Sequence, residues 1–158
     1  MVCYYGIKMN KKIVIYTAGS YDLFHFGHLN ILLKAKKLGN HLIVGVSTDA
    51  LISKYKNLKP IICYKDRVSI IKELKCVDKV IKQDRFFDIK QLKNYHINYI
   101  VLGDDWRGKK FPELDKCLKE LNIKMIYIPY TKRLSTSSIK RKIIKNAVEI
   151  IEAQTKRK

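Results

Sequence analysis

The sequence lacks the features that define several large classes of protein. No apolar run approaches the ~20 residues needed to span a bilayer, and residues 1–12 lack the apolar core of a signal peptide. The 4 cysteines are scattered, with no CxxC pair and no zinc-like Cys/His spacing. We therefore expect a cytoplasmic enzyme or binding protein with reduced thiols, no membrane association and no metal held by protein ligands alone.

Two common nucleotide-binding fingerprints are also missing. No GxxxxGK[ST] P-loop and no GxGxxG motif occurs, so P-loop hydrolases and dinucleotide dehydrogenases lose support. Acidic residues are few, and the formal net charge is +19. The lysines are spread along the whole chain and no nucleic-acid motif accompanies them. This pattern favours solvated surfaces that attract anionic small molecules, and it disfavours nucleic acid as a partner.

Apolar runs alternate with helical patterns along the chain. Runs typical of strands buried on both faces of a parallel sheet occur at 13–18, 42–47, 79–81, 99–102 and 124–128. Helical patterns occur at 27–38, 64–75, 88–95, 112–121 and 136–153, and a short helix or loop is expected at 48–59. This order predicts an α/β fold: a Rossmann-like, doubly wound, five-stranded parallel sheet with helices on both faces.

The length of 158 residues is that of a single domain. We expect that domain to occupy residues 12–155. Residues 1–11 are interpreted as an N-terminal extension, and residues 156–158 as a basic tail.

Two histidines lie where the first predicted strand passes into the first helix. His25 and His28 are three residues apart, so within a helical turn they face the same way. Asp22 offers a third ligand for a metal ion. Two imidazole N–H groups at a helix start suit a phosphate equally well. At this point metal and phosphate both stay open.

A series of motifs extends this junction into a family pattern. Ala18–His28 resembles the HxGH signature of the nucleotidylyltransferase superfamily, and Leu134–Ile139 resembles its RTEGIST motif. Between them lie Ser47-Thr-Asp49, Tyr64-Lys-Asp-Arg67, Val77-Asp-Lys-Val-Ile81 and Gly103-Asp-Asp-Trp106. In order and spacing, from about Lys12 to Ile144, the chain resembles the cytidylyltransferases, and among them the glycerol-3-phosphate cytidylyltransferases.

The resemblance implies a reaction and its participants. CTP and a small phosphorylated alcohol, such as glycerol 3-phosphate, would give a CDP-alcohol and pyrophosphate. The acceptor phosphate would attack the α-phosphorus in line without a covalent enzyme intermediate, so the protein contributes positioning and charge stabilisation. Mg²⁺ would accompany CTP by bridging its phosphates. A homodimer is also implied.

The resemblance further implies roles for individual residues. His25 and His28 would contact the CTP phosphates and the transition-state oxygens, and Ser135 and Thr136 would hold the β- and γ-phosphates. The other expected nucleotide contacts are Thr17, Ala18, Gly19, Ser20, Asp22, Gly103, Asp105, Trp106, Tyr130 and Thr131.

A lysine after the second strand would neutralise charge on the triphosphate and on the acceptor. Lys56 aligns best, but this loop carries one extra residue, so Lys54 and Lys59 remain alternatives. Arg67 and Asp22 would shape the acceptor side of the site, with Arg67 reaching toward the acceptor phosphate.

The RTEGIST-like segment departs from the family pattern at two positions. Tyr130 stands where the family has arginine, and Arg133 replaces the glycine of the motif. We hypothesise that Arg133 supplies the missing positive charge. An Arg133→Ala variant with unchanged apparent affinity for CTP would contradict this hypothesis.

Two other functions are weighed against a CTP enzyme. One is an adenylyltransferase of the same superfamily that uses ATP on a phosphorylated cofactor precursor; Gly103–Trp106 and the short chain favour CTP instead. The other is a non-catalytic nucleotide- or nucleic-acid-binding module, against which the intact histidine pair argues. The acceptor stays open among glycerol 3-phosphate, phosphocholine, phosphoethanolamine and related wall or capsule precursors.

Overall fold

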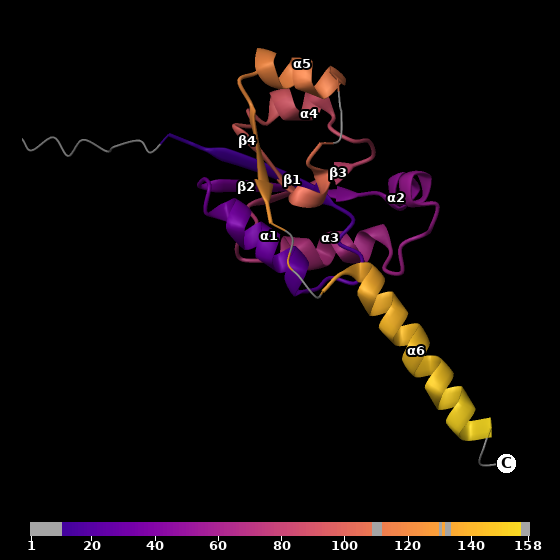
Figure 1. Ribbon diagram of the computed structural model, residues 1–158. Coiled ribbons are helices and arrows are strands. Elements are labelled where there is room, and N and C mark those ends of the chain that lie inside the picture. Colours follow the sequence, from indigo (N-terminus) through magenta and orange to yellow (C-terminus); the bar gives the residue numbers. More distant parts are fainter. Residues whose placement is uncertain (1–10, 109–111, 130, 132–133, 156–158) are drawn as a thin grey trace, which may run out of the picture.

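A computed structural model describes residues 11–108, 112–129, 131 and 134–155. Its centre is a parallel sheet with the strand order β3-β2-β1-β4-β5 (Figure 1). The strands are β1 (Val14–Gly19), β2 (His41–Ser47), β3 (Lys79–Gln83), β4 (Tyr99–Gly103) and β5 (Lys124–Ile128). The chain winds outward from β1 to β3 and then returns to place β4 on the other side of β1. The predicted α/β class, the five parallel strands and the doubly wound arrangement are confirmed.

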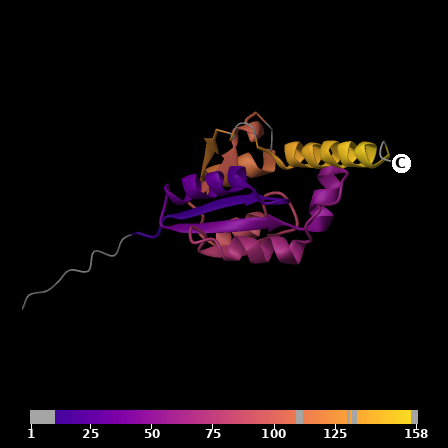
Figure 2. The same ribbon diagram turned by 90° about the horizontal axis from the view of Figure 1, so that it is seen from below.

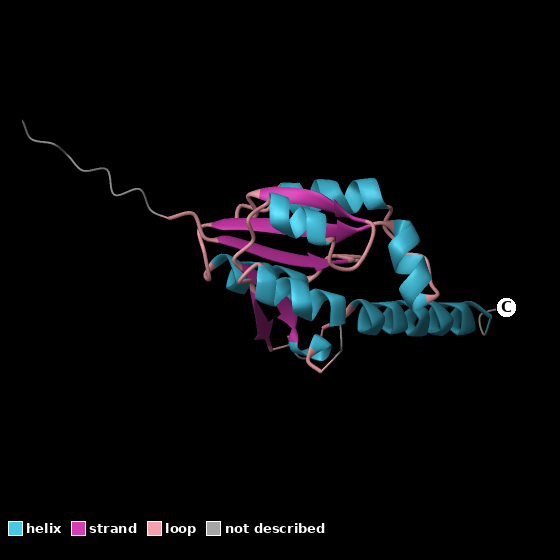
Figure 3. Ribbon diagram, turned by 90° about the horizontal axis from the view of Figure 1, so that it is seen from above, coloured by secondary structure: helices cyan, strands magenta, loops and turns pink. Residues whose placement is uncertain are grey.

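Helices cover both faces of the sheet (Figures 1 and 3). Helices α1 (Phe26–Lys36) and α3 (Tyr64–Lys72) lie on one face, and α4 (Ile89–Asn94) and α5 (Pro112–Glu120) lie on the other. The short α2 (Asp49–Lys56) follows β2, the 3₁₀ helix η1 (Asp104–Trp106) follows β4, and α6 (Thr136–Thr155) ends the described chain. No helix in the described ranges is long and apolar enough to cross a membrane.

The strands are apolar at consecutive positions because each face of the sheet has its own core. Along β1, Ile15 belongs to the cluster under α1 and α3, together with Leu32 and Ile71. Its neighbours Val14 and Tyr16 belong to the cluster under α4 and α5. Successive side chains of a strand point to opposite faces, so burial on both faces requires an uninterrupted apolar run.

The helices differ from the predicted boundaries at three places. The segment after β2 forms helix α2, which Thr48 caps through a bond from the Leu51 N–H (3.2 Å) and which ends at Asn57 in the left-handed conformation (φ 52°). Helix α3 ends at Lys72, earlier than the expected residue 75. Helix α6 continues to Thr155, slightly past the expected end at 153. The extension and the tail proposed for the two ends lie almost wholly outside the described residues.

Candidate active site

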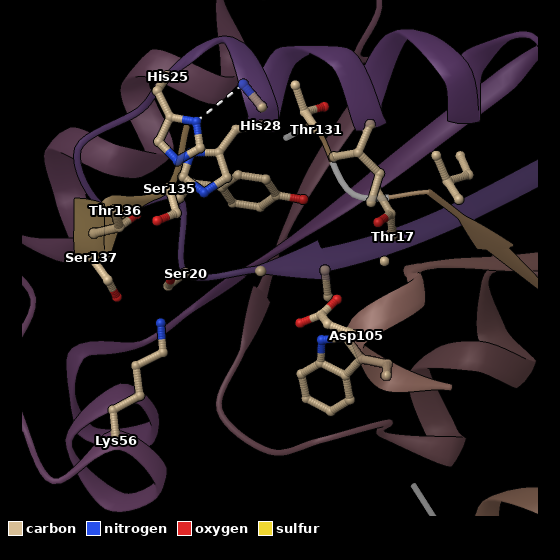
Figure 4. Close-up of a pocket in the computed structure, with 18 of the residues that line it drawn as sticks. Thr17, Ser20, His25, His28, Lys56, Asp105, Thr131, Ser135, Thr136 and Ser137 are labelled. Carbon is tan, nitrogen blue, oxygen red and sulfur yellow. Dashed lines mark hydrogen bonds between the residues drawn. The ribbon is translucent and has the colours of Figure 1, made fainter. Parts of the chain in front are cut away.

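A cavity of about 420 Å³ opens at the carboxyl ends of β1, β4 and β5 (Figure 4). This is the rim where parallel α/β sheets bind ligands. The predicted site residues that line it are Thr17, Ala18, Gly19, Ser20, His25, His28, Lys56, Gly103, Asp105, Trp106, Thr131, Ser135 and Thr136. Segments far apart in the sequence therefore meet at one place.

The turn between β1 and α1 fixes the orientation of His25. Its Nδ1 accepts a hydrogen bond from the Gly27 N–H (3.0 Å), which makes His25 the N-cap of α1. A ring nitrogen that accepts a hydrogen bond carries no proton, so the proton of the neutral ring sits on Nε2. A β-carbon at Gly27 would come within 2.8 Å of the His25 ring, which explains the glycine of the HxGH motif.

The two histidine rings are stacked on one another. Their centroids are 3.9 Å apart with an interplanar angle of 19° (Figure 4). The Tyr21 ring meets His28 edge-on. Burial, reinforced by the neighbouring His25 and Lys56, lowers the pKa of His28 to about 3, and burial also lowers the pKa of His25. The His28 Nδ1 is buried without a hydrogen-bond partner in the described structure, which further disfavours a charged ring. Both imidazoles are therefore neutral donors or acceptors near pH 7.

The start of α6 lies beside the histidines in the wall of the cavity (Figure 4). Ser135 and Ser138 cap this helix reciprocally: Ser138 N–H donates to Ser135 Oγ (3.0 Å), and Ser135 N–H donates to Ser138 Oγ (2.9 Å). Thr136 Oγ1 donates to the backbone carbonyl of Asp22 (2.9 Å), so its hydroxyl proton is already used. The Thr136 and Ser137 amides belong to the first helical turn, whose N–H groups have no partner within the helix. These amides, with the positive end of the helix dipole, form an anion-binding position.

Lys56 approaches the cavity from the opposite side, at the end of α2 (Figure 4). Neither Lys54 nor Lys59 lines the cavity. Partial burial lowers the pKa of Lys56, and Lys140 and Arg67 act in the same direction while Asp22 and Asp105 oppose them. The sequence left three lysines open, and the structure brings one of them to the cavity.

Arg67, which we expected to reach toward an acceptor phosphate, is not among the described residues that line the cavity. The residue is fully buried (0% exposed), and all three guanidinium nitrogens donate hydrogen bonds. Nε donates to the Ile62 carbonyl (2.9 Å), Nη1 to the Ser20 carbonyl, and Nη2 to Asp49 Oδ1 (2.5 Å). Arg67 thus ties the end of β1 to the start of α2, and its role is positional.

Asp22, for which we expected contacts with the nucleotide and the acceptor, is likewise not among the described residues that line the cavity. It is buried, and its Oδ1 accepts from the Ile61 and Ile62 N–H groups (3.0 and 2.9 Å). Its Oδ2 lies 3.1 Å from Lys140 Nζ on α6. These bonds to the carboxylate lower the pKa of Asp22 although burial opposes the shift. Asp22 joins the loop before α3 to α6.

Several lining residues were not predicted. They are Tyr21, Gly27, Ile31, Tyr55, Ile128, Pro129 and Ser137. Ser137 lies within the Ser/Thr cluster already recognised, and Tyr55 precedes Lys56, so both had a signal in adjacent residues. Tyr130 and Arg133 lie outside the described residues, and the hypothesis that Arg133 compensates stays a prediction.

The cavity has few ligands for a metal ion of its own. No group of three or more His, Cys, Asp or Glu side chains able to hold one occurs in the described parts of the chain. Asp105 is the one carboxylate among the described lining residues. A hard cation such as Mg²⁺ takes several oxygen ligands, so this donor set fits an ion that arrives on a phosphate chain.

The fold and the cavity define an α/β protein with a ligand cavity at the carboxyl edge of its parallel sheet. Comparison with known proteins gives the particular family: the chain belongs to the cytidylyltransferase-like family, whose model matches residues 16–142. Glycerol-3-phosphate cytidylyltransferase of Bacillus subtilis is 36% identical over 134 residues, which cover 84% of this chain and 97% of that one. The family assignment from the sequence is thereby confirmed, and the protein is a nucleotidyltransferase.

Two further relatives show how far the family extends. FAD synthase of Thermococcus sibiricus is 34% identical, over 88% of this chain and 97% of that protein. The crystal structure of a lipopolysaccharide core biosynthesis protein from Thermoplasma volcanium superposes with a TM-score of 0.63 at 28% identity, covering 78% of this chain and 99% of that one. Proteins named for different activities are therefore similar to this chain along most of their length.

Proposed function

We propose that the protein transfers CMP from CTP to a small phosphorylated alcohol, with glycerol 3-phosphate as the first acceptor to test. One observation carries the proposal: the histidine pair, Lys56 and the start of α6 face a single cavity. The glycerol-3-phosphate cytidylyltransferases that resemble this chain along most of their length support the choice of substrates.

In this proposal the triphosphate of CTP lies between the histidines and the first turn of α6. The Nε2–H of His25 and the ring of His28 donate to oxygens around the α-phosphorus. Ser135 Oγ and the amides of Thr136 and Ser137 receive the outer phosphates. Asp105 would help to hold a Mg²⁺ ion that arrives with the phosphates, and that ion would neutralise part of their charge.

The reaction is a substitution at the α-phosphorus. An oxygen of the acceptor phosphate forms the new P–O bond while the bond to the bridging oxygen of the β-phosphate breaks, and pyrophosphate leaves. Donors fixed in place before the reaction stabilise the added negative charge best, because they need no reorganisation. The neutral histidines suit this role, since they donate hydrogen bonds without requiring a proton from solvent.

Lys56 interacts with both substrates in this scheme. It lies opposite α6, so its ammonium group approaches the acceptor phosphate and the α-phosphate together and reduces their repulsion. Partial burial leaves its ammonium group less screened by solvent, and the same burial lowers the pKa of Lys56.

Lys56→Ala tests this scheme, with Lys54→Ala as the matched control. Lys54 lies on the same short helix but outside the cavity. Pyrophosphate release with CTP, Mg²⁺ and glycerol 3-phosphate should fall about 100-fold in kcat for Lys56→Ala, as for the loss of one preorganised charge-stabilising donor. It should stay near the wild-type value for Lys54→Ala. An equal fall in kcat in both variants would contradict a specific role of Lys56 in the reaction.

An ATP-dependent activity is the second candidate, because an FAD synthase is similar to this chain over nearly its whole length. The two are separated by a panel in which CTP or ATP is paired with glycerol 3-phosphate, phosphocholine, phosphoethanolamine or flavin mononucleotide. Turnover with CTP and a phosphorylated alcohol supports the proposal. Turnover confined to ATP and the flavin would refute it. His28→Ala should abolish whichever activity appears while leaving the circular dichroism spectrum unchanged.

A further inference from the structure

One hydroxyl group in the cavity is held by a residue that does not line it. Thr131 lines the cavity, and its Oγ1 accepts a hydrogen bond from Nδ2 of Asn30 (2.8 Å). Asn30 lies on α1 and is not among the described residues of the cavity wall. The two residues are 101 positions apart in the sequence, so only the fold brings them together.

This hydrogen bond leaves the hydroxyl proton of Thr131 for a ligand. A threonine hydroxyl donates one hydrogen bond and can accept two. One lone pair of Oγ1 is occupied by the Asn30 amide, and no described residue accepts the Thr131 proton. The amide N–H also excludes that proton from its own side of the oxygen. The hydroxyl is therefore available as a donor to a molecule in the cavity.

The surroundings of Thr131 suit a flat base. Thr131 lies on the opposite side of the cavity from Lys56 and Ser137 (Figure 4). The residues that line the cavity next to it in the chain, Ile128 and Pro129, are apolar. Pockets of this kind bury the apolar faces of a ligand and fix its orientation with a few polar groups.

The edge of the base decides what such a donor selects. If the triphosphate lies between the histidines and the first turn of α6, as in the proposed function on which this inference rests, the nucleoside extends toward Thr131. Cytosine has a hydrogen-bond acceptor at N3, whereas uracil has an N–H group there. A donor directed at N3 therefore favours cytosine over uracil.

We propose that the Thr131 hydroxyl donates to N3 of cytosine, and that Asn30 is the positioning residue that makes this hydroxyl a donor. The pair then selects CTP against UTP. Asn30 touches no part of the nucleotide and acts only through Thr131.

Asn30→Asp reverses the direction of the hydrogen bond. An ionised carboxylate only accepts, so it takes the Thr131 proton and leaves the lone pairs of Oγ1 for the base. The affinity for CTP should fall about tenfold relative to UTP, because a hydrogen bond is lost and an acceptor is left without a partner. The added negative charge acts on both nucleotides alike, so the ratio of their dissociation constants is the readout.

The dissociation constants of the full chain for CTP and UTP are measured by calorimetry with Mg²⁺ and without an acceptor. The wild type should bind CTP more tightly than UTP. Asn146→Asp is the matched control and should keep the wild-type ratio. Helix α6 leaves the body of the molecule after its first turns (Figures 1 and 2), and Asn146 is exposed and is not a lining residue.

Thr131→Val tests whether Asn30 acts through the hydroxyl. Valine keeps the shape of threonine but has no hydroxyl, so the affinity for CTP should fall about 3- to 10-fold, the value of one hydrogen bond. In the Thr131→Val background, Asn30→Asp should leave the CTP-to-UTP ratio unchanged. Circular dichroism and the thermal midpoint verify that each variant is folded.

Two results would overturn the proposal. One is an unchanged CTP-to-UTP ratio in Asn30→Asp, and the other is an equal change of that ratio when residue 131 is already valine. A wild type that binds CTP but transfers no CMP to any acceptor would refute the proposed function and leave this selection of the base intact. A wild type that binds neither CTP nor UTP would overturn both.

Discussion

The strongest stability prediction concerns Arg67, which the sequence placed at the acceptor and the structure places in the interior. Arg67→Met keeps much of the side-chain length but removes every donor. The Ile62 and Ser20 carbonyls then lose their partner, at about 1 to 3 kcal/mol for each buried group left unsatisfied. Asp49 adds little to this cost because its side chain is 45% exposed and can be solvated.

Removing the guanidinium also relieves the cost of burying its charge, which offsets part of the loss. The net expectation is about 2 to 4 kcal/mol of lost unfolding free energy. At about 2 to 4 °C per kcal/mol for a domain of this size, the thermal midpoint should fall by about 4 to 16 °C. Arg67→Lys should lie between Arg67→Met and the wild type, because one ammonium group cannot reproduce a fork that reaches three acceptors.

The assay is thermal and urea unfolding of both variants beside Lys65→Met, an exposed control on the same helix. Turnover at low temperature, with the acceptor concentration varied, completes the comparison. If Arg67→Lys unfolded like the wild type and only raised the KM for the acceptor, Arg67 would contact the acceptor and the positional role would be refuted.

Two further predictions concern pH and packing. The folded-state pKa of His28, about 3, lies below its unfolded value of about 6.5, so the unfolded chain binds the extra proton and stability is lost as pH falls below 6.5. Between pH 7.5 and 5.5 this loss amounts to about 1.3 kcal/mol of unfolding free energy. Urea unfolding should show a loss larger by this amount in the wild type than in His28→Asn. Equal pH dependence of the two proteins would contradict the pKa shift. In the middle of β2, a methyl group at Gly45 would overlap the Tyr16 hydroxyl, so Gly45→Ala should cost about 1 to 3 kcal/mol. Tyr16→Phe should recover part of that loss in the double variant, and full additivity of the two changes would show that the hydroxyl is not the obstacle.

The fold was predictable because the signals for it are local and repeated. Each strand is an apolar run, each crossover has a helical pattern, and the alternation leaves few topologies. The cavity followed from the same reasoning, since motifs that end parallel strands must share one rim. Helix α2 was left undecided because its capping residues, Thr48 and Asn57, are a weak signal in a segment of only a few turns.

The sequence did not show which charged residues contact a ligand and which hold other residues in place. A motif arginine or aspartate looks the same whether it binds a ligand or supports the residue that does. Arg67 and Asp22 are supports because the Ser20 and Ile62 backbone groups come close to them in space, which no spacing along the chain reveals. Likewise, the sequence could not show that Lys56 and not Lys54 lines the cavity, because that depends on which side of α2 faces the cavity.

The turn between β1 and α1 bears on the energetics of binding. Tyr21 (φ 52°) and Leu23 (φ 47°) both adopt the left-handed conformation, which costs a non-glycine residue about 1 to 2 kcal/mol. The burial of Tyr21 and the attachment of Asp22 to two neighbouring segments hold this backbone in place. A loop that is already ordered loses little conformational entropy when its ligand arrives. The strain in this turn is therefore overcome when the protein folds, and it does not reduce the affinity of the cavity for its ligand.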